Sequence, residues 1–167
     1  MKNRKKGFSL VELLIVLAVM AALIATITPV ALNAIKKSKA TQVAQNLKTL
    51  ASALENAAYV NGVYNNIVLQ AGTTNTAIKL SDLGRDIDSE KYGVWYTGTT
   101  NKPGEFEVLI FYKGTDVDAK LVNQTMPNAT DTKPNGFDSI AGNNQLGSTT
   151  LPDDKAGIFY TLTFSVY

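Results

Sequence analysis

The chain has 167 residues, which is long enough for one folded domain and an anchor but short for two domains. Its net charge is +2, but four of the 16 basic residues lie in the first six positions, and the remainder carries 12 basic against 14 acidic residues. A nucleic-acid-binding surface is therefore not indicated. The absence of Cys and His excludes disulfides, thiolate nucleophiles, the common zinc sites and histidine acid–base catalysis. We expect no enzyme activity, no cofactor and no metal site.

The N-terminal segment is apolar over residues 8–35, with Glu12 as its only ionisable side chain. A helix of about twenty residues is roughly 30 Å long, enough to cross a hydrocarbon core. Twelve Leu, Ile, Val and Phe residues lie between positions 8 and 27. They contribute on the order of −4 to −7 kcal/mol to insertion, against about 2.5–3.5 kcal/mol for a carboxylate at the bilayer centre. The segment is therefore predicted to insert into a membrane despite Glu12.

Three interpretations of this segment compete. A secretory signal peptide has a basic start and an apolar stretch, but this run is too long, contains a carboxylate, and has no small-x-small cleavage site before Thr41. A plain signal anchor would place Glu12 near the membrane interface. The third interpretation takes the basic residues, Gly7, Phe8 and Glu12 together as one signal for processing and assembly.

The stretch "KKGFSLVELLIVLAVMAAL" resembles the class III signal peptide of type IV prepilins and of the related pseudopilins. In that family a membrane peptidase cuts after the Gly that ends a short basic leader, and the new N-terminal residue is N-methylated. The resemblance implies a leader of residues 1–7, cleavage between Gly7 and Phe8, methylation of Phe8, and an assembly role for Glu12. The close match covers residues 1–35.

The resemblance also implies a function, that of a structural subunit of a type IV pilus. The precursor would insert into the cytoplasmic (inner) membrane, and the processed chain would polymerise into an extracellular cell-surface filament. Implied partners are further copies of the chain, related minor pilins, a prepilin peptidase and N-methyltransferase, an inner-membrane platform protein and an assembly ATPase. Two alternatives remain open: a pseudopilin of a type II secretion system, and a membrane-anchored enzyme or binding module.

Cleavage after Gly7 would give Glu12 a physical purpose. The cut creates an α-ammonium group at the membrane edge, and Glu12 of a neighbouring, axially shifted subunit could neutralise that group inside an apolar filament core. Pairing is the usual condition on which buried charges are tolerated. Glu12 would then set subunit register, as a single buried polar residue does in a coiled coil.

Pro29 lies late in the apolar run. In a helix it would leave the Ala25 carbonyl without its hydrogen-bond donor. A mild kink is one interpretation. The resemblance implies another, in which the helix unwinds locally when subunits pack, and the β-branched Thr26, Ile27 and Thr28 would favour unwinding. Pro29 is therefore the predicted site of a helix break.

A second, amphipathic helical pattern follows over residues 36–62. Apolar side chains recur at steps of three and four residues: Ala40, Val43, Ala44, Leu47, Leu50, Ala51, Leu54 and Ala58. The pair Asn61-Gly62 predicts the helix end. A continuous helix over residues 8–59 would be roughly 78 Å long, more than a head of this size can cover. Its N-terminal half must be covered by membrane or by other subunits.

Residues 63–167 are predicted to form a globular antiparallel β head with a C-terminal loop. The stretches "YGVWYTG" (92–98) and "EFEVLIFYKG" (105–114) predict a hairpin whose second strand is central, because both of its faces are largely apolar. Residues 158–167 alternate as a strand, and residues 65–73 could add an edge strand. The predicted fold is α+β and pilin-like, with the sheet packed on the second half of the long helix.

The segment over residues 116–157 is predicted to form a short helix followed by loop, where partner contacts often lie. Asp138, Asn144, Asp153 and Asp154 carry oxygen ligands of the kind that Ca²⁺ prefers, but their spacing meets no rule, and we interpret them as solvated loop residues. Many pilins close this region with a disulfide, which a chain without Cys cannot form.

Overall fold

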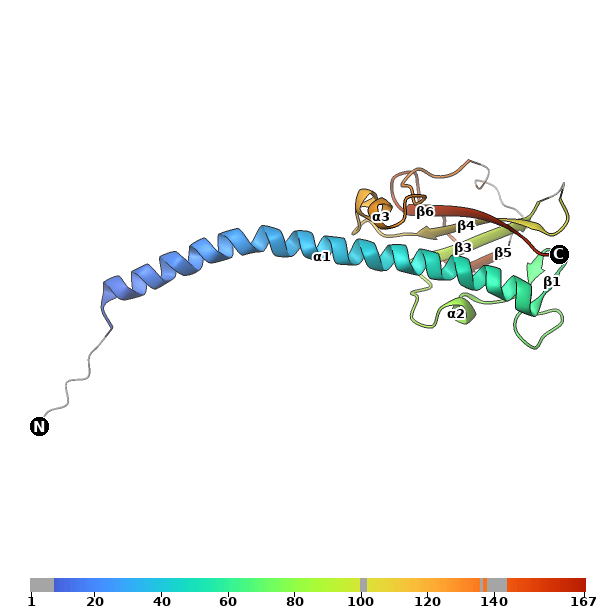
Figure 1. The fold of residues 1–167 in the computed structure, drawn as a ribbon, viewed down its shortest axis with the longest axis horizontal. Coiled ribbons are helices and arrows are strands. Elements are labelled where there is room, and N and C mark those ends of the chain that lie inside the picture. Colours follow the sequence, from blue (N-terminus) through green and yellow to red (C-terminus); the bar gives the residue numbers. More distant parts are fainter. Residues whose placement is uncertain (1–7, 100–101, 136, 138–143) are drawn as a thin grey trace, which may run out of the picture.

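The fold consists of one long helix that carries a compact head at its C-terminal half (Figure 1). The computed structural model describes residues 8–99, 102–135, 137 and 144–167. The predicted leader of residues 1–7, with Gly7, lies outside the described residues. Helix α1 (Leu10–Asn61) is 52 residues long, and the head is a four-stranded sheet with short flanking elements. The predicted α+β, pilin-like layout is confirmed.

Local chemistry accounts for both ends of α1. Ser9 is extended and precedes the first turn, in which Glu12 is the acidic residue that favours a helix N-terminus. At the other end Gly62 has φ of 84°, a conformation that a residue without Cβ adopts at little cost. The predicted helix end at Asn61-Gly62 is confirmed.

The second half of α1 buries one stripe against the head. The buried residues of the helix are Ala40, Val43, Ala44, Leu47, Leu50, Ala51, Leu54 and Ala58. These are the apolar positions that the three- and four-residue spacing predicts, because such positions fall on one face of a 3.6-residue helix.

The main sheet is antiparallel with strand order β5-β3-β4-β6. Its strands are β3 (Tyr92–Gly98), β4 (Glu105–Tyr112), β5 (Asn144–Gly147) and β6 (Ile158–Ser165). The predicted hairpin is β3–β4, and β4 is central as expected, although it ends two residues early. Strand β5 has no counterpart in the sequence prediction, because "NQLG" is short and lacks alternation.

Four small elements complete the head. Strands β1 (Val63–Tyr64) and β2 (Ile67–Val68) form a separate hairpin just after α1. Helix α2 (Leu80–Leu83) was not predicted, whereas α3 (Ala119–Thr125) falls within the predicted short helix. The sheet lies along one side of α1, and α3 lies at the end of the head nearer the bare half of α1 (Figure 1).

The sheet has apolar residues on both faces. The inner face packs on α1 through residues such as Val94, Tyr96, Val108 and Ile110. The outer face carries a second cluster: Trp95, Leu109, Phe111, Phe137 and Phe159. Both β3 and β4 are therefore buried on two sides, which explains their nearly continuous apolar runs.

Candidate assembly site

The N-terminal half of α1 stands free of the head and is exposed throughout. Every residue from position 8 to position 39 is exposed in the isolated chain, and burial begins at Ala40. Large apolar side chains in this half are more than half exposed: Phe8, Leu10, Val11, Leu13, Leu14, Ile15, Val16, Leu17, Val19, Met20, Leu23, Ile24, Ile27, Val30, Leu32 and Ile35. α1 is long and apolar enough to cross a membrane.

The exposed apolar area is too large to remain in water. Burying a Val, Leu, Ile, Phe or Met side chain contributes roughly 1.5–3 kcal/mol, so covering the exposed part of each contributes on the order of 1 kcal/mol. Summed over the set, the effect is on the order of 15 kcal/mol, as large as the whole folding free energy of a domain. This half of α1 therefore requires cover from lipid or from protein.

Glu12 is engaged within the first turn of its own helix. The backbone N–H of Ser9 donates to the Glu12 carboxylate, with 2.9 Å between the nitrogen and Oε2. This contact occupies one of the N–H groups that a helix start leaves without a partner. The carboxylate thus lies beside the position at which cleavage would create a new N-terminus.

The two residues at the predicted cleavage site are Gly7 and Phe8, and the structure describes only Phe8. Gly7 lies outside the described residues. Phe8 directly precedes Ser9, and 80% of its surface is exposed. An exposed residue just before the helix start is accessible to modifying enzymes. Cleavage after Gly7 and methylation of Phe8 stay predictions.

Pro29 lies within an uninterrupted α-helix. Side-chain hydroxyls bond to the backbone nearby: Thr26 Oγ1 donates to the Leu23 carbonyl at 2.9 Å, and Thr28 Oγ1 donates to the Ile24 carbonyl at 2.7 Å. Such bonds compete with the helix ladder and often accompany bends. The helix curves in this half without breaking (Figure 1). The helix break at Pro29 stays a prediction for the packed state.

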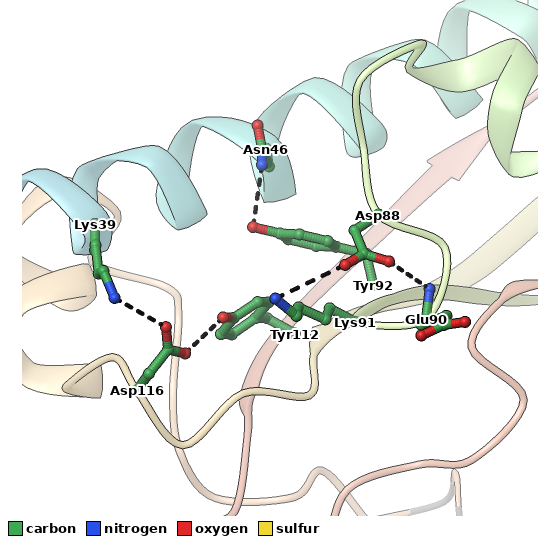
Figure 2. Close-up of polar contacts among 8 residues, drawn as sticks. All are labelled: Lys39, Asn46, Asp88, Glu90, Lys91, Tyr92, Tyr112 and Asp116. Atoms are coloured by element: carbon green, nitrogen blue, oxygen red, sulfur yellow. Dashed lines mark hydrogen bonds and ion pairs between the residues drawn. The ribbon is translucent and has the colours of Figure 1, made fainter.

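A polar network joins α1 to the head where the exposed half begins (Figure 2). The Asp116 carboxylate accepts from the Tyr112 hydroxyl at 2.7 Å through Oδ1, and its Oδ2 lies 3.4 Å from Lys39 Nζ on α1. The Tyr112 hydrogen bond, with a smaller effect of Lys39, holds the pKa of Asp116 below its usual value. Burial, with the same hydrogen bond, raises the pKa of Tyr112.

A second contact crosses the same interface. Asn46 Nδ2 on α1 donates to the Tyr92 hydroxyl at 3.0 Å, and the rings of Tyr92 and Tyr112 are 4.9 Å apart. Burial raises the pKa of Tyr92, although the Asn46 hydrogen bond acts against that shift. Together the two contacts fix the rotation of α1 against β3 and β4. Sequence reasoning missed this network, because its members are far apart in the chain.

The oxygen-bearing loop residues considered for Ca²⁺ do not converge where they are described. Asp138 lies outside the described residues. Asn144 Nδ2 donates to the Asn66 carbonyl at 2.7 Å, and Asp154 Oδ1 accepts from the Lys133 N–H at 2.9 Å. The described part of the chain contains no group of three or more acidic side chains that could hold a metal ion.

The long half-exposed helix with a sheet packed on its second half defines the class as pilin-like. Residues 2–28 match the family model for the prokaryotic N-terminal methylation motif, which is the class III signal peptide of type IV pilins. The motif indicates a type IV pilin-like or pseudopilin precursor. The match ends at residue 28 and does not cover the head. Neither a curated protein nor a solved structure was found that matches the chain.

The motif and the exposed helix agree on the chemistry of the N-terminal half. A class III signal peptide followed by an apolar helix suggests membrane insertion of the precursor. The motif belongs to a structural, pilin-type family, which is consistent with the expectation of no enzyme activity.

Proposed function

We propose that this chain is a structural subunit of a type IV pilus. The precursor inserts into the cytoplasmic (inner) membrane through residues 8–35, loses residues 1–7 by cleavage between Gly7 and Phe8, and is methylated on Phe8. The processed subunit then leaves the membrane and polymerises into an extracellular cell-surface filament. Copies of the same chain replace the lipid around the exposed half of α1.

The observation that carries this proposal is the bare half of α1. Its apolar surface is continuous with the helix that holds the head, and nothing in the described head covers it. If lipid alone covered this surface, the helix would act as a permanent membrane anchor. The methylation motif favours a subunit that exchanges lipid for protein, because its processing prepares an N-terminus for packing.

Glu12 is proposed to act in the exchange. In the isolated chain its carboxylate accepts from the Ser9 N–H. In a filament it would pair with the α-ammonium group of a neighbouring, axially shifted subunit. Because the two opposite charges are paired, both can be buried in an apolar core. The remaining proposed partners are related minor pilins, the peptidase and N-methyltransferase, an inner-membrane platform protein and an assembly ATPase.

The test is an intact mass of the protein recovered from filaments sheared off intact cells. The proposal expects a mass that lacks residues 1–7 and carries one added methyl group. A processed protein confined to the membrane fraction would instead favour a pseudopilin of a type II secretion system, the second candidate, because the motif serves both. An unprocessed mass would contradict both and leave a plain membrane anchor.

Deletion of the chain separates the two candidates further. Loss of surface fibres with normal secretion of exoproteins supports the pilus subunit. Loss of exoprotein secretion with fibres intact supports the pseudopilin.

A further inference from the structure

Strand β6 forms one edge of the main sheet, and backbone groups in the middle of that edge have no partner among the described residues. Residues of an antiparallel strand direct their N–H and C=O groups alternately to one neighbour and to the other. Phe159 pairs with Thr130 on the side away from β4, at 2.7 and 2.9 Å between nitrogen and oxygen. Thr161 and Thr163 therefore direct their groups to the same side, where no described residue pairs with them.

Both ends of this open stretch are closed by other contacts. Thr130 occupies the edge at Phe159. At the other end the Tyr59 hydroxyl donates to the Ser165 carbonyl at 2.9 Å. The open stretch between them is long enough for a short strand to form up to four backbone hydrogen bonds with Thr161 and Thr163.

The stretch lacks the features that usually prevent edge pairing. Natural edge strands are commonly protected by Lys, Pro or a bulge. Strand β6, "IFYTLTFS", contains no charged residue and no Pro, and it pairs with β4 without interruption from end to end. The exposed side chains at its centre are those of Thr161 and Thr163, which favour extended backbone.

A hollow of about 390 Å³ lies on the outer face of the sheet over β4 and β6. It is lined by Glu107, Thr161 and Thr163 from the strands and by Pro134, Asn135 and Phe137 from the loop above them. Glu107 is the only charged residue among the described residues that line it. The hollow therefore favours a positively charged side chain.

The strand register connects the open edge to this carboxylate. Glu107 lies opposite Thr163, so the two side chains share the outer face. A strand added to β6 would lie about 4.8 Å beyond it, with its own residue opposite Thr163 on that same face. Since the Thr163 side chain is short, a Lys or Arg at that position could extend across it to Glu107.

We propose that the open edge of β6 binds an extended segment of another protein, with a Lys or Arg placed opposite Thr163. The segment continues the sheet by pairing with the backbone of Thr161 and Thr163, and its basic side chain pairs with Glu107. In this mode of recognition the backbone supplies affinity and the side-chain hollow supplies specificity.

The main-sheet edge strands of a second copy do not supply the basic residue that this edge favours. The edge strands that another copy could offer from its main sheet are β5, "NQLG", and β6 itself, and neither contains Lys or Arg. We therefore assign the edge to a segment of a different protein, and this assignment does not depend on whether the chain forms a pilus.

The test uses the full-length chain, labelled with ¹⁵N, in a non-ionic detergent. The probes are two blocked heptapeptides, one alternating Val with Lys and the other alternating Val with Glu. The Lys peptide is expected to shift the amide signals of Thr161 and Thr163 and to slow their hydrogen exchange. It should bind about two- to fivefold more tightly than the Glu peptide, as expected for one exposed charge pair.

Two variants test the geometry. Glu107→Lys should reverse the preference between the peptides, whereas Glu90→Lys, the same charge change in an exposed loop, should leave it unaltered. Thr163→Pro removes an edge N–H without removing a bond to β4, so it should weaken both peptides while the circular dichroism spectrum is retained. Three results would overturn the proposal. They are equal binding of the two peptides, a preference for the Lys peptide that persists in Glu107→Lys, and unchanged hydrogen exchange at the amides of Thr161 and Thr163.

Discussion

The backbone N–H of Ser9 donates to the carboxylate of Glu12 at 2.9 Å, so Glu12 is bonded within its own first turn before any assembly. If the chain is cut after Gly7, the α-ammonium group of Phe8 will lie one residue from this contact. Glu12 would then have two competing cationic or N–H partners, its own N-terminus and that of a neighbour. The choice between them depends on charge as well as on hydrogen bonding.

Variants at Glu12 separate these two effects. Glu12→Gln keeps an acceptor for the Ser9 N–H but removes the charge, and Glu12→Ala removes both. We expect both variants to insert and to be cleaved normally but to yield few or no filaments, because an unpaired α-ammonium group in an apolar core is costly. Filament yield after shearing is the measurement. Normal yield from the Gln variant would mean that the carboxylate serves only to start the helix.

The same substitution at two leucines on α1 should affect two different properties, the stability of the head and the yield of filaments. Leu54 is fully buried against the head, so Leu54→Ala should lower the free energy of unfolding by about 2–5 kcal/mol. Leu14 lies in the exposed half, so Leu14→Ala should leave the thermal unfolding of the head in detergent unchanged and reduce filament yield. Equal destabilisation by the two variants would contradict the division of α1 into covered and bare halves.

Pro29→Ala tests the proposed break in the helix. The substitution restores a backbone hydrogen bond and removes a clash, together worth about 3 kcal/mol in a helix interior. We expect normal insertion and processing, slower hydrogen exchange around residue 29, and fewer or stiffer filaments. Val30→Ala, which keeps the proline, is the matched control. Filaments of normal yield and flexibility from Pro29→Ala would exclude a role for unwinding.

Asp116 makes the contact between α1 and the head sensitive to acid. Its pKa is held below the ordinary value of about 3.9, so its stabilising effect is complete above pH 4 and is lost as the pH falls further. Because the carboxylate is half exposed, Asp116→Asn should cost less than about 1 kcal/mol at neutral pH. Chemical unfolding at pH 7 and pH 3 checks this, with Asp153→Asn as the control. The variant should lose less stability than the wild type between pH 7 and pH 3. An equal loss in the two proteins would contradict the role of Asp116 in this acid sensitivity.

Tyr96 gives the opposite dependence at high pH. Burial raises its pKa to about 12, and its hydroxyl accepts from the Val68 N–H at 3.2 Å. The folded state therefore favours the neutral phenol. That stabilisation is complete below about pH 10 and is lost as the pH rises toward 12. Tyr96→Phe should cost about 1 kcal/mol at neutral pH but lose less stability at pH 11 than the wild type. Tyr64→Phe, at an exposed position, should change neither quantity.

The long helix and its two halves were predictable because their determinants are local. The apolar run over residues 8–35 and the stripe from Ala40 to Ala58 are both patterns within one continuous segment. The β3–β4 hairpin was predictable for the same reason, since its two strands are separated by a short turn. In each case residues close in sequence provide the partners that form the element.

The elements that the sequence prediction missed depend on distant partners. The four residues of β5 form a strand because β3, about fifty residues earlier in the chain, supplies the pairing groups. Helix α2 is a single turn whose buried Leu80 and Leu83 pack in the core around α1. Short segments of this kind have too little local preference to specify their own conformation.

The sequence by itself determined the methylation motif and the apolar helix of the N-terminal segment, because both are patterns within one continuous stretch of the chain. Gly7, Phe8 and Glu12 lie within about two helical turns of each other, and the apolar run covers residues 8–35. Only the tertiary structure decided how Lys39 and Asn46 hold the head on α1, and that the edge-facing backbone groups of Thr161 and Thr163 have no partner among the described residues. Those features depend on strand order and on packing between distant segments, and no local pattern encodes them.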